Sequence, residues 1–380
     1  MAKRETHKED KSNWPLFNRL LYSYIELTRF DELPENPKIG KNYEYWPEGR
    51  LCANGNPYHG CIRLGSKNKL IIGFSGGGVS VNEYTAARPQ RIGGKGEMFY
   101  SDDVRFADIV PKVGTFGKGK KNPFKEWNLL FVPYATGDFH CGTGDFNYKD
   151  IDGKKAVLYH HGYKNYRALL KKIKELVPEP EQILVTGFSA GAFATALLAS
   201  DIAEYFPDCH NITACVDSAI MHYDWHKVSR DVWKTPDEIS ERLTGTEIVS
   251  DSLIALHKSH PEIKIMFCCS KRDAALTQMD MFFEDGRWIP DKAAGLSFER
   301  KLSNMINNLI EAIPDISIFI FDTPDKNNKA AELTVHCLCG SNGAFSTYVD
   351  GVSCAEWMRR GVDGEVMKLG LNKLNGDLNL

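Results

Sequence analysis

The sequence predicts an α/β fold with a mostly parallel central sheet and helices on both faces. Short apolar runs bounded by Gly, Pro or Asp, which are typical of buried strands, alternate with helical patterns along the chain. Such alternation favours a parallel sheet covered on both sides. The expected strands are residues 69–74, 128–134, 155–160, 182–187, 212–218, 263–270 and 316–322, and the expected helices are 165–176, 192–206 and 298–313.

The 380 residues are expected to form a single domain, because no Ser/Gly-rich linker divides them. Two regions fall outside the strand–helix pattern. Residues 1–60 are polar and aromatic, and we expect them to be an N-terminal extension wrapped on the core. Residues 219–260 are predicted to be a helical insertion between two strands, above the edge of the sheet where ligands bind.

Composition excludes several classes of protein. The net charge of −3 offers no basic field for nucleic acid. No run approaches the ~18 apolar residues of a membrane span. The N-terminus is charged and lacks an apolar signal segment, which predicts a cytoplasmic location, or a secreted one if the N-terminus is truncated. The ten cysteines do not suggest a disulfide scaffold in a chain of this length; Cys268 and Cys269 are expected to be buried thiols.

Residues 187–191 read Gly-Phe-Ser-Ala-Gly, between an expected strand and an expected helix. A strand that turns at once into a helix exposes the residue at the turn, and small residues on either side let the chains pass closely. The following helix N-terminus offers free N–H groups to a developing oxyanion. This context makes Ser189 a candidate nucleophile; the alternative is a chance match to a common short pattern.

A nucleophilic serine needs a base and an acid, which in this arrangement follow it along the chain as acid and then histidine. Of the histidines after Ser189, only His336 follows the last expected strand. Asp273 closes the strand 263–270 and is the preferred acid, although it could equally cap the next helix. Asp322 and, more weakly, Asp217 are competitors at the ends of neighbouring strands.

Three consecutive glycines, residues 76–78, follow the expected strand 69–74. Such a loop can donate backbone N–H groups to an oxyanion, so Gly77, Gly78 and the N–H of Ala190 are the expected donors. The alternative is a phosphate-binding loop, but the Gly-Lys-Ser/Thr sequence of that loop is absent.

Further polar clusters have two interpretations each. Asp138, His140 and Asp145 could form half of a metal site, as could His336 with Cys337 and Cys339. We expect no metal. Metal-assisted hydrolysis would need further ligands in similar clusters, and His336, Cys337 and Cys339 are too close in sequence for a usual zinc site.

Residues near these clusters carry similar ambiguity. His160, which ends an expected strand ahead of a helix, could lie near the pocket or anchor its loop. Tyr223, Trp225 and Trp233 could cover the face of a sugar ring or form a small core of their own.

Seven segments, in this order along the chain, resemble the pectin acetylesterase family, which also contains the carboxylesterase Notum. They are FSGGGVSVN, FVPYATGDFHCG, YHHGYKNYRALL, TGFSAGAF, KRDAALTQMD, HCLCGSNGAF and DGVSCAEWMRR, spanning roughly residues 50–360. The resemblance implies an α/β-hydrolase fold and removal of acyl groups from oxygen. It places the family's serine on Ser189, its aspartate on Asp273, its histidine on His336 and its glycine-rich loop on Gly77 and Gly78. The family's Thr-Gly-Asp-x-His segment lines its site near the nucleophile, so the resemblance implies that Asp138 and His140 line the substrate pocket or brace a loop.

The sequence therefore predicts a serine carboxylic-ester hydrolase that needs no cofactor. The expected substrate is an O-acetylated carbohydrate, such as a pectin- or xylan-type oligosaccharide; no oligomeric state is predicted. Three alternatives remain. They are an esterase for a longer acyl or phenolic ester, a metal hydrolase built on Asp138 and His140, and a non-catalytic carbohydrate-binding protein.

Overall fold

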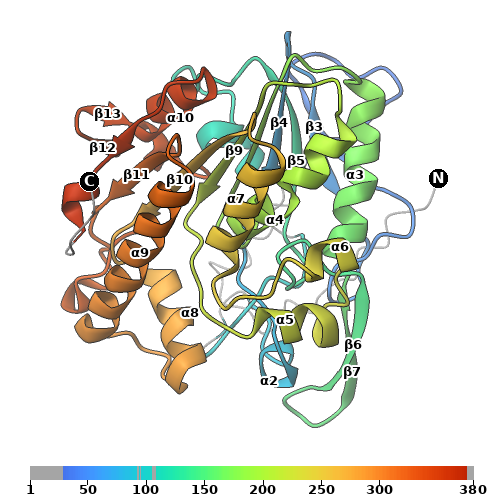
Figure 1. Ribbon diagram of the computed structural model, residues 1–380. Helices are drawn as coiled ribbons and strands as arrows, with labels where there is room; N and C mark the ends of the chain where they lie inside the picture. The colour runs from blue at the N-terminus through green and yellow to red at the C-terminus, as the bar shows by residue number, and fades with distance from the viewer. Residues whose placement is uncertain (1–28, 92–93, 95, 105–107, 375–380) are drawn as a thin grey trace.

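The computed structural model describes residues 29–91, 94, 96–104 and 108–374. Its centre is a ten-stranded sheet with strand order β1-β2-β3-β5-β4-β8-β9-β10-β11-β14 (Figure 1). Strand β3 is antiparallel to both of its neighbours, β2 and β5, and all other pairs in the sheet are parallel. The strands are β1 (Asp31–Glu32), β2 (Asn42–Tyr45), β3 (Gly60–Arg63), β4 (Lys67–Phe74), β5 (Trp127–Val132), β8 (Gln182–Phe188), β9 (Ile212–Asp217), β10 (Lys264–Ser270), β11 (Ser317–Phe321) and β14 (Lys368–Leu369).

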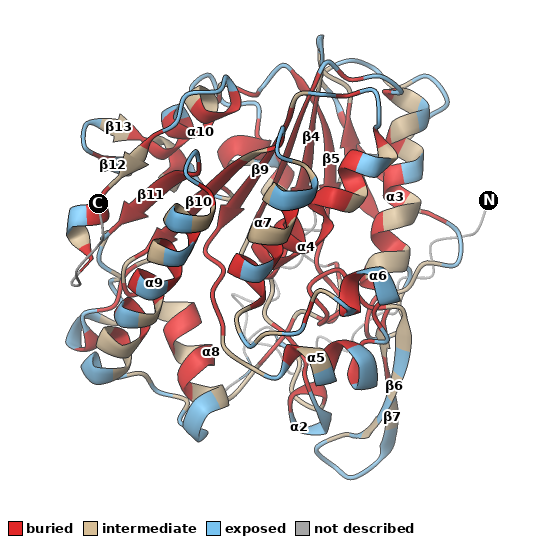
Figure 2. Ribbon diagram, viewed as in Figure 1, coloured by how far each residue is buried: buried red, intermediate tan, exposed pale blue. Residues whose placement is uncertain are grey.

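Helices cover both faces of the sheet, as predicted. One face packs against α3 (Gly162–Leu176), α4 (Ala190–Tyr205), α7 (Ile248–Ser259) and α9 (Lys292–Ala312). The other packs against α10 (Cys354–Val362) and three short 3-10 helices, η1 (Val110–Lys112), η2 (Gly114–Phe116) and η5 (Asn342–Phe345). Figure 2 shows the strands buried and the outer sides of α3, α7 and α9 exposed.

Two of the covering helices show how sequence sets their position. In α3 the buried residues Tyr166, Leu169, Leu170 and Ile173 recur at the spacing of one helix face, so this helix has one side in solvent. Helix α4 is Ala-rich and buried on nearly every side. It lies over β8 and β9 at the centre of the sheet, where it fixes the residue that precedes it, Ser189.

Six of the seven expected strands belong to the sheet, and the seventh does not. Residues 155–160 form β7, which pairs antiparallel with β6 (Gly144–Lys149) in a separate two-stranded ribbon. Side chains along β6 alternate between exposed and partly buried, and β7 is also exposed in part. A ribbon of this kind has one face in solvent, whereas the apolar run suggested a fully buried strand.

The expectation of an N-terminal extension needs correction. Residues 1–28 lie outside the described part of the chain, but residues 31–63 supply β1, β2 and β3 and so extend the sheet. The sequence Asn-Tyr-Glu-Tyr of β2 carries no apolar run, although its first three residues are buried. The polar side chains of β2 interact with other groups inside the protein, and a search for apolar runs does not detect such a strand.

The region 219–260 also differs from expectation. It contains α5 (Trp225–Lys227), the π-helical turn η3 (Val228–Val232), α6 (Asp237–Ser240) and α7. Helix α7 is the crossover between β9 and β10 and packs on α4 and α9, so it belongs to the layer over the sheet and not to a cap. Trp225 and Trp233 are buried against Phe139, as expected for aromatics that build a core.

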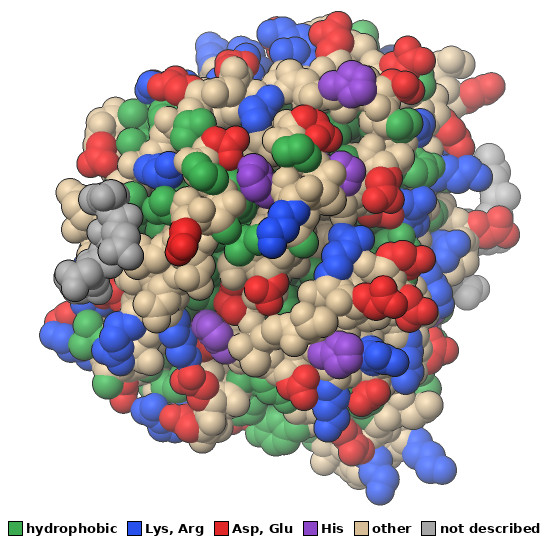
Figure 3. Space-filling model, viewed as in Figure 1, with side chains coloured by type: hydrophobic (Ala, Val, Ile, Leu, Met, Phe, Trp, Pro, Cys, Tyr) green, Lys and Arg blue, Asp and Glu red, His purple; other side chains and the backbone are tan. Residues whose placement is uncertain are grey.

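The carboxyl ends of the parallel strands meet at one edge, at the lower part of Figure 1. Helices α2 (Glu83–Ala86), α5 and α8 (Ala274–Asp285) lie at this edge, since each follows the end of a strand. Acidic and basic side chains are interspersed over the face seen in Figure 3. Within the described residues, no helix has both the length and the apolar character needed to cross a bilayer.

Candidate active site

Ser189 occupies a strained turn between β8 and α4. Its φ of 56° and ψ of −127° lie outside the regions that non-glycine residues favour. The turn requires the flanking glycines. A Cβ on Gly187 would lie 2.1 Å from the main-chain oxygen of Gly191, and a Cβ on Gly191 would lie 2.2 Å from that of Phe74. The predicted sharp strand-to-helix turn is therefore present, with Ser189 at its tip.

The glycine-rich loop after β4 lies directly against this serine. A Cβ on Gly76 would be 2.4 Å from the Cβ of Ser189, so only glycine fits there. Gly78 has a φ of 76°, and a Cβ on it would collide with the main-chain oxygen of Phe99 at 1.8 Å. Among the described residues, the N–H groups of Gly77, Gly78 and Ala190 donate to no partner. The expected oxyanion donors are thus unused and lie on the two segments that meet at Ser189.

His336 and Asp273 form a close pair. The Nδ1 atom of His336 lies 2.8 Å from both carboxylate oxygens of Asp273. Asp273 is fully buried, and its Oδ1 also accepts the N–H groups of Ala275 and Leu276 at the start of α8. The two expected roles of Asp273, partner of the histidine and helix cap, therefore coexist. The competitor Asp322 instead pairs with Lys373 at the protein surface.

Asp217, the weaker competitor, holds the loop that carries His336. Its Oδ2 accepts the N–H groups of Leu338 at 2.8 Å and Cys339 at 2.7 Å, and the carboxylate is fully buried. Its main-chain oxygen accepts the N–H of Ser189 at 3.0 Å. One residue at the end of β9 thus connects the serine turn to the histidine loop.

The electrostatics of the site favour a charged imidazole. Burial alone would lower the pKa of His336, but the charge and hydrogen bond of Asp273 and the charge of Asp217 outweigh it, so the pKa is raised above its usual value. Burial raises the pKa of Asp217, although the N–H groups that it accepts oppose this. The raised pKa means that the surroundings of His336 stabilise the protonated imidazole, as a histidine that accepts a proton requires.

Ser189 and His336 line the same cavity, which has a volume of about 410 Å³. The glycines 76–78 and Ala190 line it too. The Ser189 hydroxyl and the imidazole of His336 make no hydrogen bond in the described structure; catalytic hydrogen bonds often form only when a substrate is bound. Most of the remaining wall is apolar and comprises Phe139, Phe188, Phe193, Leu276, Met279 and Trp288. Of residues 219–260, only Met221 reaches this cavity. The cover expected from that region is therefore formed mainly by α8 and by residues 98–99.

Three residues expected to lie near the pocket are buried in the protein and do not line it. They are Asp138, His140 and His160. Asp138 accepts the N–H groups of Gly142 and Gly162, while His140 Nε2 is 3.0 Å from the main-chain oxygen of Ser75, beside the glycine-rich loop. These contacts fit the bracing alternative. His140 bonds to the start of the glycine-rich loop, whereas Asp138 and His160 bond to main-chain groups of residues 136, 142 and 162.

Burial changes the pKa of each of these three groups. It raises the pKa of Asp138 to about 6, although the donors around the carboxylate oppose it. It lowers the pKa of His140 to about 4 and that of His160 to about 3, so both imidazoles are neutral at pH 7.

The metal-site alternatives do not assemble in the structure. Asp138, His140 and Asp145 do not meet as a ligand group, and neither do His336, Cys337 and Cys339. In the described part of the chain, one group has the required proximity: Glu44, His59 and Asp108, which the sequence did not suggest.

Sequence reasoning missed several residues of the site. Gly76 lies in the same glycine run as the residues it proposed, and only the contact with Ser189 distinguishes it. The apolar wall from α8 follows a helical spacing, Leu276 and Met279, that is equally typical of core residues. A single sequence therefore does not distinguish the wall of a pocket from the core.

Comparison with known proteins adds a family assignment. No curated protein matches the chain. The model of the family described as Pectinacetylesterase matches residues 47–243, which include the glycine-rich loop and Ser189 but end before Asp273 and His336. Because this match covers more than half of the 380 residues, the chain belongs to the pectinacetylesterase family of ester hydrolases.

Proposed function

We propose that this protein is a serine esterase that removes O-acetyl groups from carbohydrate, such as pectin- or xylan-type oligosaccharides. One observation carries the proposal. Ser189, at the tip of a strained turn, lines one cavity together with His336, whose other ring nitrogen contacts a buried carboxylate. Family membership supports ester hydrolysis, and the family's name points to acetyl groups on pectin.

In the proposed reaction, the hydroxyl oxygen of Ser189 attacks the ester carbonyl. His336 accepts the hydroxyl proton at Nε2 and passes it to the departing alcohol, while Asp273 orients the imidazole and stabilises its charged form. The N–H groups of Gly77, Gly78 and Ala190 donate to the tetrahedral oxyanion, each contributing about 3 kcal/mol in comparable sites. Water, activated by His336, then releases the acid from the acyl-enzyme. No step calls for a cofactor.

The cavity suits a compact substrate. Its volume of about 410 Å³ lies in the usual range for small-molecule sites, which leaves room for more than the acetyl group. Trp288 in the wall can stack on the apolar face of a sugar ring, and Gln90, Gln278 and Ser341 can bond to its hydroxyls.

The apolar wall also favours a second candidate, an esterase for a longer acyl or phenolic ester. Phe139, Phe193 and Met279 would then pack on the acyl chain. A series of nitrophenyl esters from acetate to octanoate separates the two candidates. The acetylesterase proposal predicts the highest kcat/KM for acetate, and an optimum at six carbons or more would favour the second candidate.

Acetate release tests the main proposal. The purified protein is incubated with nitrophenyl acetate and with acetylated xylan and pectin fragments, beside Ser189→Ala and the control Ser346→Ala, which changes an exposed serine. We expect release by the wild type and the control but not by Ser189→Ala. Absence of acetate from all substrates would contradict the proposal. Retention of activity in Ser189→Ala with its loss on chelation would favour a metal hydrolase, and carbohydrate binding without turnover would favour a binding protein.

A further inference from the structure

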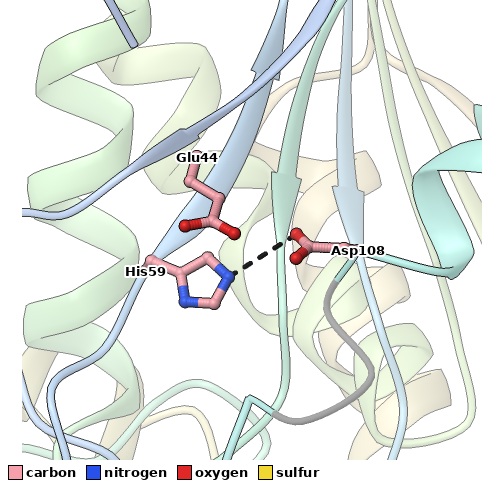
Figure 4. Close-up of side chains that lie close together, drawn as sticks. All are labelled: Glu44, His59 and Asp108. Carbon is pink, nitrogen blue, oxygen red and sulfur yellow. Dashed lines mark ion pairs between the residues drawn. The ribbon is translucent and has the colours of Figure 1, made fainter. Parts of the chain in front are cut away.

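Three side chains that could bind a metal converge beside strands β2 and β3, and none of them lines the cavity (Figure 4). They are Glu44 from β2, His59 from the residue before β3, and Asp108 from the segment before η1. One ligand atom from each lies within 4.8 Å of the others. Their exposed fractions are 0%, 1% and 4%, so water does not solvate them as it would a surface cluster.

The histidine lacks the partners that a buried imidazole needs. Neither ring nitrogen of His59 makes a hydrogen bond within the described structure. Its Nε2 points towards Asp108, but the 3.6 Å to Oδ1 is too long for a good hydrogen bond. Buried side-chain nitrogens are nearly always satisfied, so this ring indicates a bound group that completes the cluster.

The charges of the two carboxylates also favour a bound cation. Two carboxylates in a buried place need positive charge close by. Arg29 approaches Glu44 to 4.0 Å from the partly exposed side. Asp108 faces the unsatisfied imidazole. A cation between the three side chains would pair with the carboxylates and bind the imidazole nitrogen.

A tryptophan holds two of the three side chains in place. The indole N–H of Trp46 donates to Glu44 Oε2 at 2.9 Å, and its ring stacks on His59 with centroids 4.3 Å apart. Groups that surround a metal site commonly orient the ligands in this way.

We propose that Glu44, His59 and Asp108 bind one divalent metal ion, with Zn²⁺ as the preferred metal. An imidazole with two carboxylates suits Zn²⁺, which takes four ligands and would keep one position for water. Ca²⁺ needs six to eight oxygen ligands, and an imidazole nitrogen is a poor substitute. None of the three residues lines the catalytic cavity, so the ion is structural. It fastens β2 and the start of β3 to the segment ahead of η1.

Metal analysis of the full-length protein tests this proposal. After purification without chelator, and again after EDTA treatment and dialysis against Zn²⁺, elemental analysis should give one zinc per chain. At free Zn²⁺ about 100 times the dissociation constant, we expect Tm to rise by roughly 3 °C over the chelated protein. Saturating Co²⁺ should give a visible spectrum of nitrogen and oxygen ligands. A thiolate charge-transfer band would place the metal on cysteines and overturn the proposal.

Variants locate the ion. His59→Gln and Asp108→Asn should lose stoichiometric zinc and the Tm response. The control His161→Gln, which removes another histidine paired with a carboxylate, should keep both. Ser189→Ala should also keep the zinc, which separates this site from the proposed esterase chemistry. If both cluster variants fold too poorly to purify, the wild-type stoichiometry and Co²⁺ spectrum still decide. Failure of the wild type to bind Zn²⁺, with a stability that depends only on pH, would instead indicate a protonated His59 between the carboxylates and overturn the proposal.

Discussion

The main-chain N–H of Ser189 donates a 3.0 Å hydrogen bond to the main-chain oxygen of Asp217, whose carboxylate accepts two N–H groups from the loop after His336. Asp217 touches neither the Ser189 hydroxyl nor the imidazole through a hydrogen bond in the described structure. Asp217 is a positioning residue. It holds the Ser189 turn and the loop after His336, which are distant in sequence, next to each other at the cavity.

Asp217→Asn should therefore change the pH profile as well as the rate. Both N–H groups bond to the same oxygen, Oδ2, and would then meet a neutral amide oxygen in place of a charged one, so we expect a loss of about 1–3 kcal/mol in the free energy of unfolding. Removing the charge of Asp217 also lowers the pKa of His336. Denaturant unfolding and a pH series of kcat/KM would measure both. The control Asp322→Asn, at the exposed end of the next strand, should leave the profile unchanged. An unshifted profile in Asp217→Asn would show that the residue is only structural.

The wild-type pH profile follows from the raised pKa of His336. The proposed base works only when neutral. The kcat/KM for nitrophenyl acetate should thus fall as pH decreases through the pKa of His336, with a midpoint above the usual value of about 6.5. A midpoint clearly below that value would contradict the electrostatic description of the site.

Asp273→Asn tests the pair at 2.8 Å directly. An amide can favour the wrong imidazole tautomer, and the loss of charge lowers the pKa of His336. By analogy with other triads we expect kcat to fall by about 10⁴. Circular dichroism and Tm would confirm that α8, which Asp273 caps, remains folded. A loss below tenfold in a folded variant would mean that another acid serves His336.

Gly76→Ala should lower the rate by about 10²-fold or more, because the added methyl displaces part of the site. The added methyl would lie 2.4 Å from the Cβ of Ser189, so the serine turn or the glycine-rich loop must shift. A misplacement of about 1 Å can cost 10²-fold in rate. Steady-state kinetics on folded protein would measure this, with Gly119→Ala as the control, because a Cβ at Gly119 meets open space. Full activity in Gly76→Ala would refute the described contact.

Stability should fall in acid because of His140 and His160. Burial lowers their pKa values to about 4 and about 3, so between these values and about 6.5 each takes up a proton only on unfolding. The unfolded state then binds more protons, and each histidine contributes a loss of up to about 1.4 kcal/mol per pH unit as pH falls. Denaturant unfolding from pH 7 to pH 4.5 would measure the slope. His160→Gln should reduce it, and an equal slope in that variant would contradict the assignment.

The sequence predicted the central sheet well, because parallel strands buried on both faces are continuous apolar runs. It missed β1, β2, β3 and β14, because strands of two to four residues carry too short a pattern. It also misplaced 155–160, because an apolar run does not distinguish a central strand from a half-exposed ribbon. Residues 187–191 identified the serine turn through local sterics. Asp273 and His336 were found from chain order, whereas the roles of Asp217, Gly76 and the Glu44–His59–Asp108 cluster depend on contacts between distant segments that no local pattern encodes.

Covalent labelling tests the central claim most directly. A fluorophosphonate probe followed by peptide mass spectrometry should give one adduct per chain, on Ser189. Labelling should vanish in Ser189→Ala and slow by orders of magnitude in His336→Ala, whose serine lacks its base. An adduct on a different residue, or equal labelling rates in the wild type and His336→Ala, would contradict a nucleophile at residue 189 activated by residue 336.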